Sequence, residues 1–268
     1  MRAKKSLGQN FLRNDDVIRR IVEGLDLSDR DTVIEIGPGR GALTEKLLET
    51  GAKVIAIEID REFVPALRVQ FHFQPNFSVI EADVLDVDFA KVSPPADASR
   101  SDLKLVGNLP YNISTPILQR LIEQRHLFST LVLMFQREVV ERITAPPGGK
   151  ERGFLSVLVE NAFTSEHLFD VDPQAFQPVP KVWSAVVRLT PKAAGIGDEP
   201  EFRRLVSLSF AQKRKTILNN LKPVLENAPR FLAESGIGGT RRAETLTLEE
   251  WKALHASIAD SKIIPQGK

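Results

Sequence analysis

A short apolar strand that runs through a glycine-rich loop into a helix is the feature that most constrains how this chain can fold. The strand is Thr32–Ile36, the loop is Gly37-Pro38-Gly39-Arg40-Gly41, and the helix is predicted over Ala42–Leu48, ending before Gly51. A strand, a tight turn and a helix in this order begin a βαβ unit, which connects parallel strands. The sequence therefore predicts a parallel sheet with helices on its faces.

The alternation of strands and helices continues along the chain. After the N-cap signal Asn14-Asp15-Asp16, apolar residues recur at helical spacing from Val17 to Leu25. Further strands are predicted over residues 53–57, 77–81, 103–106, 130–135, 156–163 and 185–189, and further helices over 62–70, 115–124 and from 136 onward. The last two strands predict one antiparallel addition to a doubly wound parallel sheet.

Two domains are expected. A chain of 268 residues can bury one main core and a smaller one. Residues 191–200 form a linker of Gly, Ala and Pro, and a helical section follows from Phe202 to about Ile258. We predict an α/β domain over residues 1–192 and a small all-helical domain over residues 198–268.

Composition excludes several classes of protein. The chain has no cysteine, which excludes disulfides, thiolate metal sites and a cysteine nucleophile. No apolar run is long enough to span a bilayer, and the basic Met1–Lys5 leads into polar residues rather than an apolar signal core. We therefore expect a cytoplasmic protein without a membrane span. The four histidines, at positions 72, 126, 167 and 255, lack ligand spacing, so no metal site is predicted.

The net charge of +1 does not by itself indicate a nucleic-acid partner, but clustered basic residues do. Such clusters lie at Lys4-Lys5, at Arg137 and Arg142, and at Lys213-Arg214-Lys215. The last cluster is either a solvated helix face or a set of phosphate contacts on the helical domain.

The glycine loop predicts a nucleoside site without phosphates. Glycines at the first strand-to-helix turn let the backbone approach a ligand, and ligands collect at the carboxyl ends of such strands. The loop departs from the dinucleotide pattern GxGxxG because its third glycine comes one residue early. Pro38 also removes an N–H that a pyrophosphate would use. An NAD-linked oxidoreductase is thus a disfavoured alternative.

Acidic residues follow three successive predicted strands. Glu58 stands about 20 residues beyond the glycine loop, where an acid binds ribose hydroxyls. Asp83 can accept from an adenine amino group. The alternatives are a surface carboxylate that caps the next helix for Glu58, and a turn cap for Asp83. Acids at three strand ends favour binding, and S-adenosylmethionine is the candidate cofactor.

The stretch Asn108-Leu109-Pro110-Tyr111 predicts a site for an amino group on a flat ring. The lone pair of an exocyclic amino nitrogen is delocalised into the ring, which makes the nitrogen a poor nucleophile. The Asn108 side-chain carbonyl and the Leu109 backbone carbonyl would hold its hydrogens out of plane and localise that pair. Pro110 stiffens the turn, and Tyr111 can stack on the base. A β-turn with a capping Asn is the alternative.

Taken together, these motifs resemble the small-subunit ribosomal RNA adenine dimethyltransferases, the KsgA family, over nearly the whole chain. The similar stretches are Gly8–Leu12, Glu35–Gly39, Asn108–Pro116, Ala175-Phe176, Pro180–Val182, Ser184–Arg188 and Phe210–Thr216. The resemblance implies a Rossmann-like S-adenosylmethionine-dependent methyltransferase sheet over 1–192 and an RNA- or ribosome-contacting helical domain. It also implies dimethylation at N6 of two adjacent adenosines near the 3′ end of 16S rRNA, in the 30S subunit or its precursor.

The resemblance implies roles for single residues. The residues expected at the cofactor are Asn10, Leu12, Gly37, Glu58, Asp83 and Asn108. Of these, Asn10 and Leu12 would close over the methionine end, which Gly37 would touch through its backbone. Asn108 would also serve the target site with Leu109 and Tyr111. Phe176 matches an aromatic that sandwiches the target base opposite Tyr111, and a core Phe is the alternative reading.

Several points stay open. Asn-Leu-Pro-Tyr is shared with resistance-type 23S rRNA adenine methyltransferases, so a 23S enzyme is the near alternative, and an assembly factor with incidental catalysis is another. Trp183 departs from the family, in which many relatives carry a small or polar residue. If exposed it would add RNA-facing surface, and if buried it would not bear on activity. A monomer is expected because no long apolar seam is evident.

Overall fold

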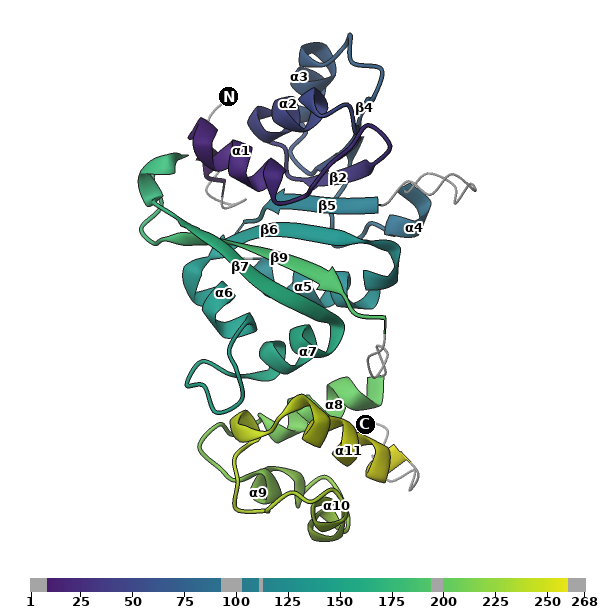
Figure 1. The fold of residues 1–268 in the computed structure, drawn as a ribbon, viewed down its shortest axis with the longest axis vertical. Helices are drawn as coiled ribbons and strands as arrows, with labels where there is room; N and C mark the ends of the chain where they lie inside the picture. Colours follow the sequence, from purple (N-terminus) through teal and green to yellow (C-terminus); the bar gives the residue numbers. More distant parts are fainter. Residues whose placement is uncertain (1–8, 93–102, 111–112, 194–199, 260–268) are drawn as a thin grey trace. The chain divides into compact units, whose positions relative to one another are not determined.

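The computed structural model describes residues 9–92, 103–110, 113–193 and 200–259 (Figure 1). The chain forms two compact units, one of residues 1–140 and 164–191 and one of residues 141–163 and 192–268. Residues 141–163 thus group with the C-terminal helices, although the sequence places them in the first domain. The predicted boundaries, with an α/β domain ending at residue 192 and an RNA-contacting helical domain beginning at residue 198, stay a prediction.

The first unit is built on a seven-stranded sheet in the order β4-β3-β2-β5-β6-β9-β7. Its strands are β2 (Thr32–Ile36), β3 (Lys53–Glu58), β4 (Phe77–Glu81), β5 (Leu103–Asn108), β6 (Thr130–Gln136), β7 (Phe163–Val171) and β9 (Ser184–Pro191). Strands β2 to β6 pair in parallel, and β9 pairs antiparallel to β6. The predicted doubly wound sheet with one antiparallel addition is confirmed.

Helices cover both faces of this sheet. Helices α1 (Asp15–Glu23), α2 (Ala42–Glu49) and α3 (Phe63–Gln70) bury their apolar sides in one core cluster with β-strand residues such as Val33 and Val106. The order reverses between β2 and β5, so the right-handed crossover through α5 (Ser114–Glu123) covers the opposite face. The short helices α4 (Phe89–Val92) and α6 (Arg137–Ile143) follow β4 and β6.

The start of α1 illustrates how local sequence sets these elements. The side chain of Asn14 accepts a hydrogen bond from the Val17 N–H at 3.0 Å, so the predicted N-cap is confirmed. Asp15 and Asp16 in the first turn stabilise the helix because their negative charges lie at the positive end of the helix dipole. This cap fixes the point at which the N-terminal segment turns away from α1.

A two-stranded sheet joins that N-terminal segment to a distant part of the chain. Strand β1 (Phe11–Leu12) pairs antiparallel with β8 (Phe176–Gln177), which places Leu12 opposite Phe176. The Arg13 N–H extends the pairing by donating to the Ala175 carbonyl at 2.8 Å. Strands of two residues carry no readable period, so the sequence did not predict this pairing.

The prediction of a strand over residues 156–163 is wrong. These residues lie mostly in helix α7 (Phe154–Ala162), and β7 begins only at Phe163. A short apolar run has the same pattern in a buried strand and in a buried helix, and seven of the nine α7 residues are buried. The Gly153 N–H donates to Ser156 Oγ at 2.9 Å, which satisfies a group at the helix start and favours the helix.

The second unit is helical, as predicted for residues 202–258. Its helices after α7 are α8 (Pro200–Ser209), α9 (Ile217–Leu221), α10 (Ala228–Glu234) and α11 (Leu248–Ala259). The basic stretch Lys213–Lys215 lies in an exposed turn between α8 and α9, so the reading as a helix face is wrong. In the part of the chain that the structure describes, no helix has the length and apolarity needed to cross a membrane.

A buried arginine holds residues 141–163 within the second unit. Arg152 is 1% exposed and donates to the carbonyls of Ala145 and Leu246 at 2.9 and 3.2 Å. It also forms an ion pair with Glu160 at 2.5 Å. A charge at this depth persists only when it is paired and hydrogen-bonded.

We predict that Arg152→Ala destabilises the second unit by about 3 kcal/mol, because it leaves Glu160 and two carbonyls without their donor. Hydrogen exchange should rise more in α11 than in β5, and urea unfolding should measure the loss. The control is Arg242→Ala, which removes an arginine that is 53% exposed and should change little. Equal effects of the two substitutions would contradict this assignment.

Candidate functional site

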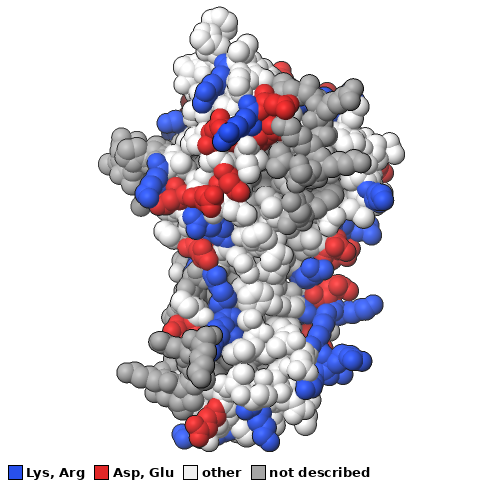
Figure 2. All heavy atoms as spheres, turned by 180° about the vertical axis from the view of Figure 1, so that it is seen from behind, with Lys and Arg blue, Asp and Glu red and all other residues white. Residues whose placement is uncertain are grey.

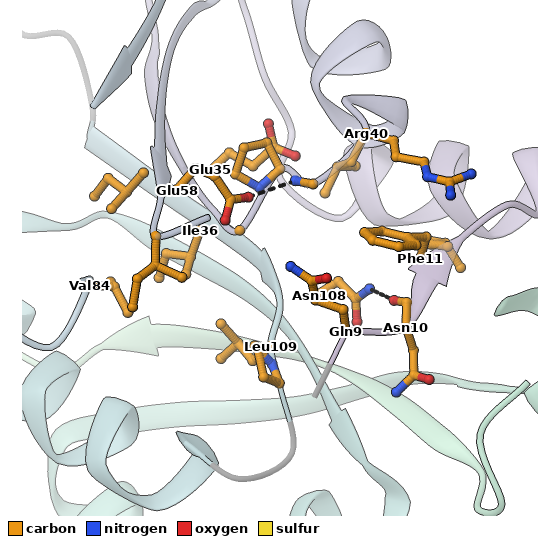
Figure 3. Close-up of a pocket in the computed structure, with 18 of the residues that line it drawn as sticks. Gln9, Asn10, Phe11, Glu35, Ile36, Arg40, Glu58, Val84, Asn108 and Leu109 are labelled. Carbon is orange, nitrogen blue, oxygen red and sulfur yellow. Dashed lines mark hydrogen bonds between the residues drawn. The ribbon is translucent and has the colours of Figure 1, made fainter. Parts of the chain in front are cut away.

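A cavity lies at the carboxyl edge of the sheet, where the strand order reverses between β2 and β5 (Figure 3). Ligands of open α/β sheets bind at this position. The lining residues are Gln9–Leu12, Glu35–Arg40, Ala42, Leu43, Ile57–Ile59, Ala82–Val84, Asn108–Pro110 and Ile113. Every residue that the sequence assigns to the cofactor is among them, as is Leu109. Their individual roles are proposals, but the structure brings them to one place.

Backbone N–H groups of the glycine loop donate hydrogen bonds to carbonyl groups of the protein itself. Gly37 donates to the Ile57 carbonyl at 2.9 Å, and Gly41 donates to the Pro38 carbonyl at 2.9 Å. Gly37 and Gly39 have φ values of +64° and +55°, a conformation that side chains rarely adopt. A phosphate cradle needs several backbone N–H groups that point at the ligand. The internal bonds of this loop therefore disfavour a pyrophosphate, in agreement with the sequence.

Glu58 holds the loop against the end of β3. One carboxylate oxygen accepts from the Gly39 N–H at 3.0 Å (Figure 3). The other accepts from the Asp60 N–H at 2.8 Å. Glu58 is only 4% exposed, which excludes the surface-cap alternative. Burial raises the pKa of its carboxyl, and the charge of Asp60 raises it further, against the lowering effect of the backbone hydrogen bonds.

Glu35 is a second buried carboxyl at the cavity, and the sequence reasoning assigned it no role. It is 1% exposed, and its Oε2 accepts from the Thr44 hydroxyl at 2.6 Å. Burial raises the pKa of Glu35 to about 8, and the charge of Glu58 adds to the rise. A glutamate inside the otherwise apolar strand Thr32–Ile36 was the signal that could have identified it.

The N-terminal segment forms one wall of the cavity through two polar contacts. Gln9 Nε2 donates to Asp60 Oδ2 at 3.0 Å. Asn108 Nδ2 donates to the backbone carbonyl of Asn10 at 3.0 Å (Figure 3). The segment is thus tied both to the end of β3 and to the end of β5. Gln9 and Asp60 were not predicted, because their contact spans 51 residues and leaves no local pattern.

Phe11 completes this wall by packing between the start of α3 and the glycine loop. Its ring meets Phe63 edge to face at 5.5 Å. The Arg40 guanidinium lies 4.8 Å from the centroid of the Phe11 ring (Figure 3). A Cβ on Gly39 would lie 3.1 Å from the Phe11 ring, so the glycine leaves just enough room for it. The loop and the N-terminal segment therefore fit together closely.

Asn108 and Leu109 lie at the end of β5 with their amide groups fixed. Because the Asn108 NH2 group bonds to Asn10, its carbonyl oxygen is the atom suited to accept from a ligand. The Leu109 N–H donates to the Met134 carbonyl at 3.2 Å, which fixes the orientation of this turn. Tyr111 lies outside the described residues.

The two remaining predicted residues differ in position. Asp83 lines the cavity, and its Oδ1 also accepts from the Leu85 N–H at 2.9 Å, so it caps a turn as well. Phe176 is 3% exposed, belongs to the core cluster and does not line the cavity. Its burial matches the core-Phe alternative, and its role at the target base stays a prediction.

Comparison with known proteins decides the family. A family model described as ribosomal RNA adenine dimethylase matches residues 1–260. A ribosomal RNA small subunit methyltransferase A of Geobacter sulfurreducens is 44% identical over 267 residues, which cover 95% of this chain and 94% of the relative. One of Pseudomonas aeruginosa is 42% identical over 262 residues, covering 97% and 96%. The chain belongs to the ribosomal RNA adenine dimethylase family.

Solved structures agree with this membership. A dimethyladenosine transferase from Plasmodium falciparum has a TM-score of 0.79 and 26% identity, covering 94% of this chain and 98% of that one. The 23S rRNA methyltransferase ErmE has a TM-score of 0.71 and 28% identity, covering 93% and 100%. The Rossmann-like methyltransferase fold and the enzyme class predicted from the sequence are confirmed for this dimethylase-family member.

We predict that Glu35→Gln makes this dimethylase-family protein more stable than wild type, increasingly so from pH 5 to about pH 8. The folded-state pKa of about 8 lies above the ordinary 4.5, so the native state binds the extra proton in this window. Wild-type stability therefore falls as pH rises, and the uncharged variant avoids that loss, on the order of 2–4 kcal/mol.

Urea unfolding at several pH values measures this difference. The control is Glu45→Gln, an exposed glutamate next to Thr44 on α2, which should follow the wild-type curve. A Glu35→Gln curve parallel to that of the wild type would show that Glu35 ionises normally.

Proposed function

We propose that this protein transfers methyl groups from S-adenosylmethionine to N6 of two adjacent adenosines near the 3′ end of 16S rRNA. The substrate would be the 30S subunit or its precursor, and each adenosine would be dimethylated. The observation that carries the proposal is the position of Asn108 and Leu109 beside a nucleoside-type cavity in a member of the ribosomal RNA adenine dimethylase family. The small-subunit relatives, at 44% and 42% identity, favour 16S rRNA.

The polar groups of the cavity fit S-adenosylmethionine. They are mainly acceptors, which suits hydroxyls, amino groups and a positive charge better than phosphates. In this proposal Glu58 would accept from the ribose hydroxyls and Asp83 from the adenine amino group, while Asn10, Leu12 and Gly37 would enclose the methionine end. When bound, the sulfonium supplies an electrophilic methyl group.

The residues at the end of β5 would prepare the target nitrogen. The carbonyl oxygens of Asn108 and Leu109 accept hydrogen bonds from the amino group and stabilise positive charge that develops on N6. The base must leave its stack to reach this turn, and Tyr111 would stack on its face. Since alignment with the methyl group provides most of the rate, the mechanism requires no strong general base.

The proposal also covers the oligomeric state of the protein, its compartment and the part of it that contacts RNA. We expect a monomer in the cytoplasm that takes part in small-subunit biogenesis, with the helical domain contacting RNA through Lys213–Lys215. Figure 2 shows acidic and basic side chains interspersed over one face, with Lys and Arg more numerous in its lower half. Such a mixed surface agrees with the net charge of +1, and we therefore expect local basic clusters to carry the affinity for RNA.

The proposal is tested by incubating the protein and labelled S-adenosylmethionine with 30S subunits that lack the methyl groups, and separately with 23S rRNA. Label should enter 16S rRNA. Label confined to 23S rRNA would support the resistance-type alternative, and binding of 30S without any transfer would support an assembly factor.

We predict that Asn108→Ala lowers methyl transfer to 30S subunits by about 100-fold or more, as expected when a fixed acceptor for developing charge is lost. The far-UV spectrum and the unfolding midpoint should stay close to wild type. Gln70→Ala, which removes an exposed amide on α3, is the control and should keep full activity. Near-normal turnover of Asn108→Ala would rule out the proposed mechanism.

A further inference from the structure

Trp183 is a large aromatic side chain left in contact with solvent. It is 43% exposed, and Val179 and Val182 in the same segment between β8 and β9 are 51% and 43% exposed. Neighbouring exposed apolar side chains often mark a binding surface. None of these three residues lines the cavity described above.

Strand pairing places Trp183 at the same edge of the sheet as the cavity. Asn108 in β5 lies opposite Met134 in β6, and Gln136, two residues further along β6, lies opposite Ser184 in β9. Trp183 directly precedes Ser184. Adjacent strands lie roughly 4.8 Å apart, so Trp183 stands about 10 Å across the sheet from the strand that carries Asn108.

Positive side chains flank the tryptophan. The Arg137 N–H donates to the Trp183 carbonyl at 2.9 Å, and the Arg137 guanidinium is 48% exposed, 3.9 Å from the Asp170 carboxylate. Lys181 is exposed two residues before Trp183. Aromatic rings beside cations form surfaces that bind unpaired nucleotides, because bases stack and phosphates pair.

We propose that Trp183, with Arg137 and Lys181, forms a stacking platform for an unpaired nucleotide of the RNA substrate next to the target adenosine. The proposal rests on the proposed function, since it takes the cavity edge to be where RNA approaches. The platform holds a neighbouring nucleotide by its base while the target base lies at Asn108. It adds affinity for RNA without taking part in methyl transfer.

The test compares three variants in methyl transfer to 30S subunits that lack the methyl groups. Trp183→Ala should raise KM for 30S subunits about 5- to 100-fold, the loss expected for one stacked base. The value of kcat and the affinity for S-adenosylmethionine should stay within about twofold. Trp183→Phe keeps a ring and should lose much less. Phe73→Ala, which removes an aromatic that is 92% exposed between α3 and β4, is the matched control.

The outcomes separate this proposal from the proposed function. If the wild-type protein does not methylate 30S subunits, the proposed function fails. If the wild type is active but Trp183→Ala has the KM of wild type or of Phe73→Ala, the platform is overturned. A fall in kcat with unchanged KM would likewise overturn it, because the side chain would then act on the transfer step.

Fluorescence gives a second measurement. The chain has two tryptophans, and Trp251 is fully buried, so a soluble quencher reaches mainly Trp183. A synthetic RNA hairpin with two adjacent adenosines in an unpaired loop should protect Trp183 from acrylamide once it saturates the protein. Unchanged quenching at saturation would contradict stacking.

Discussion

One hydrogen bond, from the Asn108 side chain to the backbone carbonyl of Asn10, joins the two parts of the site. The two residues are 98 positions apart, one at the end of a central strand and the other in the segment before α1. Through this bond the wall that would enclose the cofactor and the turn that would receive the target base share one side chain. The Gln9–Asp60 contact and the β1–β8 pairing hold the same segment from its other sides.

A second constraint is the burial of two carboxyl groups at the sheet edge. Burial raises the pKa of both groups, and the charge of Glu58 raises that of Glu35 further, while the Thr44 hydroxyl and the backbone N–H groups at Glu58 act in the opposite direction. Because the Gly39 N–H donates a hydrogen bond to Glu58, the glycine loop keeps its conformation without a phosphate. The same bond leaves the Gly39 N–H no longer available to a pyrophosphate, which disfavours a dinucleotide.

The sequence predicts most of the fold, because its signals are local. The strand Thr32–Ile36 and the cap at Asn14 follow from apolar pattern and side-chain chemistry within a few residues. The helix α7 was misread because a short, mostly apolar stretch such as residues 156–163 fits either element, and the packing of the second unit decides between them. Long-range contacts such as the pairing of Leu12 with Phe176 leave no local trace, so the sequence could not show what Phe176 packs against.

The nucleoside that the protein produces distinguishes N6 dimethylation of adenosine from every other methylation of 16S rRNA. Undermethylated 30S subunits would be incubated with the protein and S-adenosylmethionine, and the nucleosides of their 16S rRNA would be separated and weighed by mass spectrometry. We expect N6,N6-dimethyladenosine as the final product, in two neighbouring positions near the 3′ end of the 16S rRNA. A product that stops at monomethyladenosine, or a methyl group on another base or atom, would contradict it.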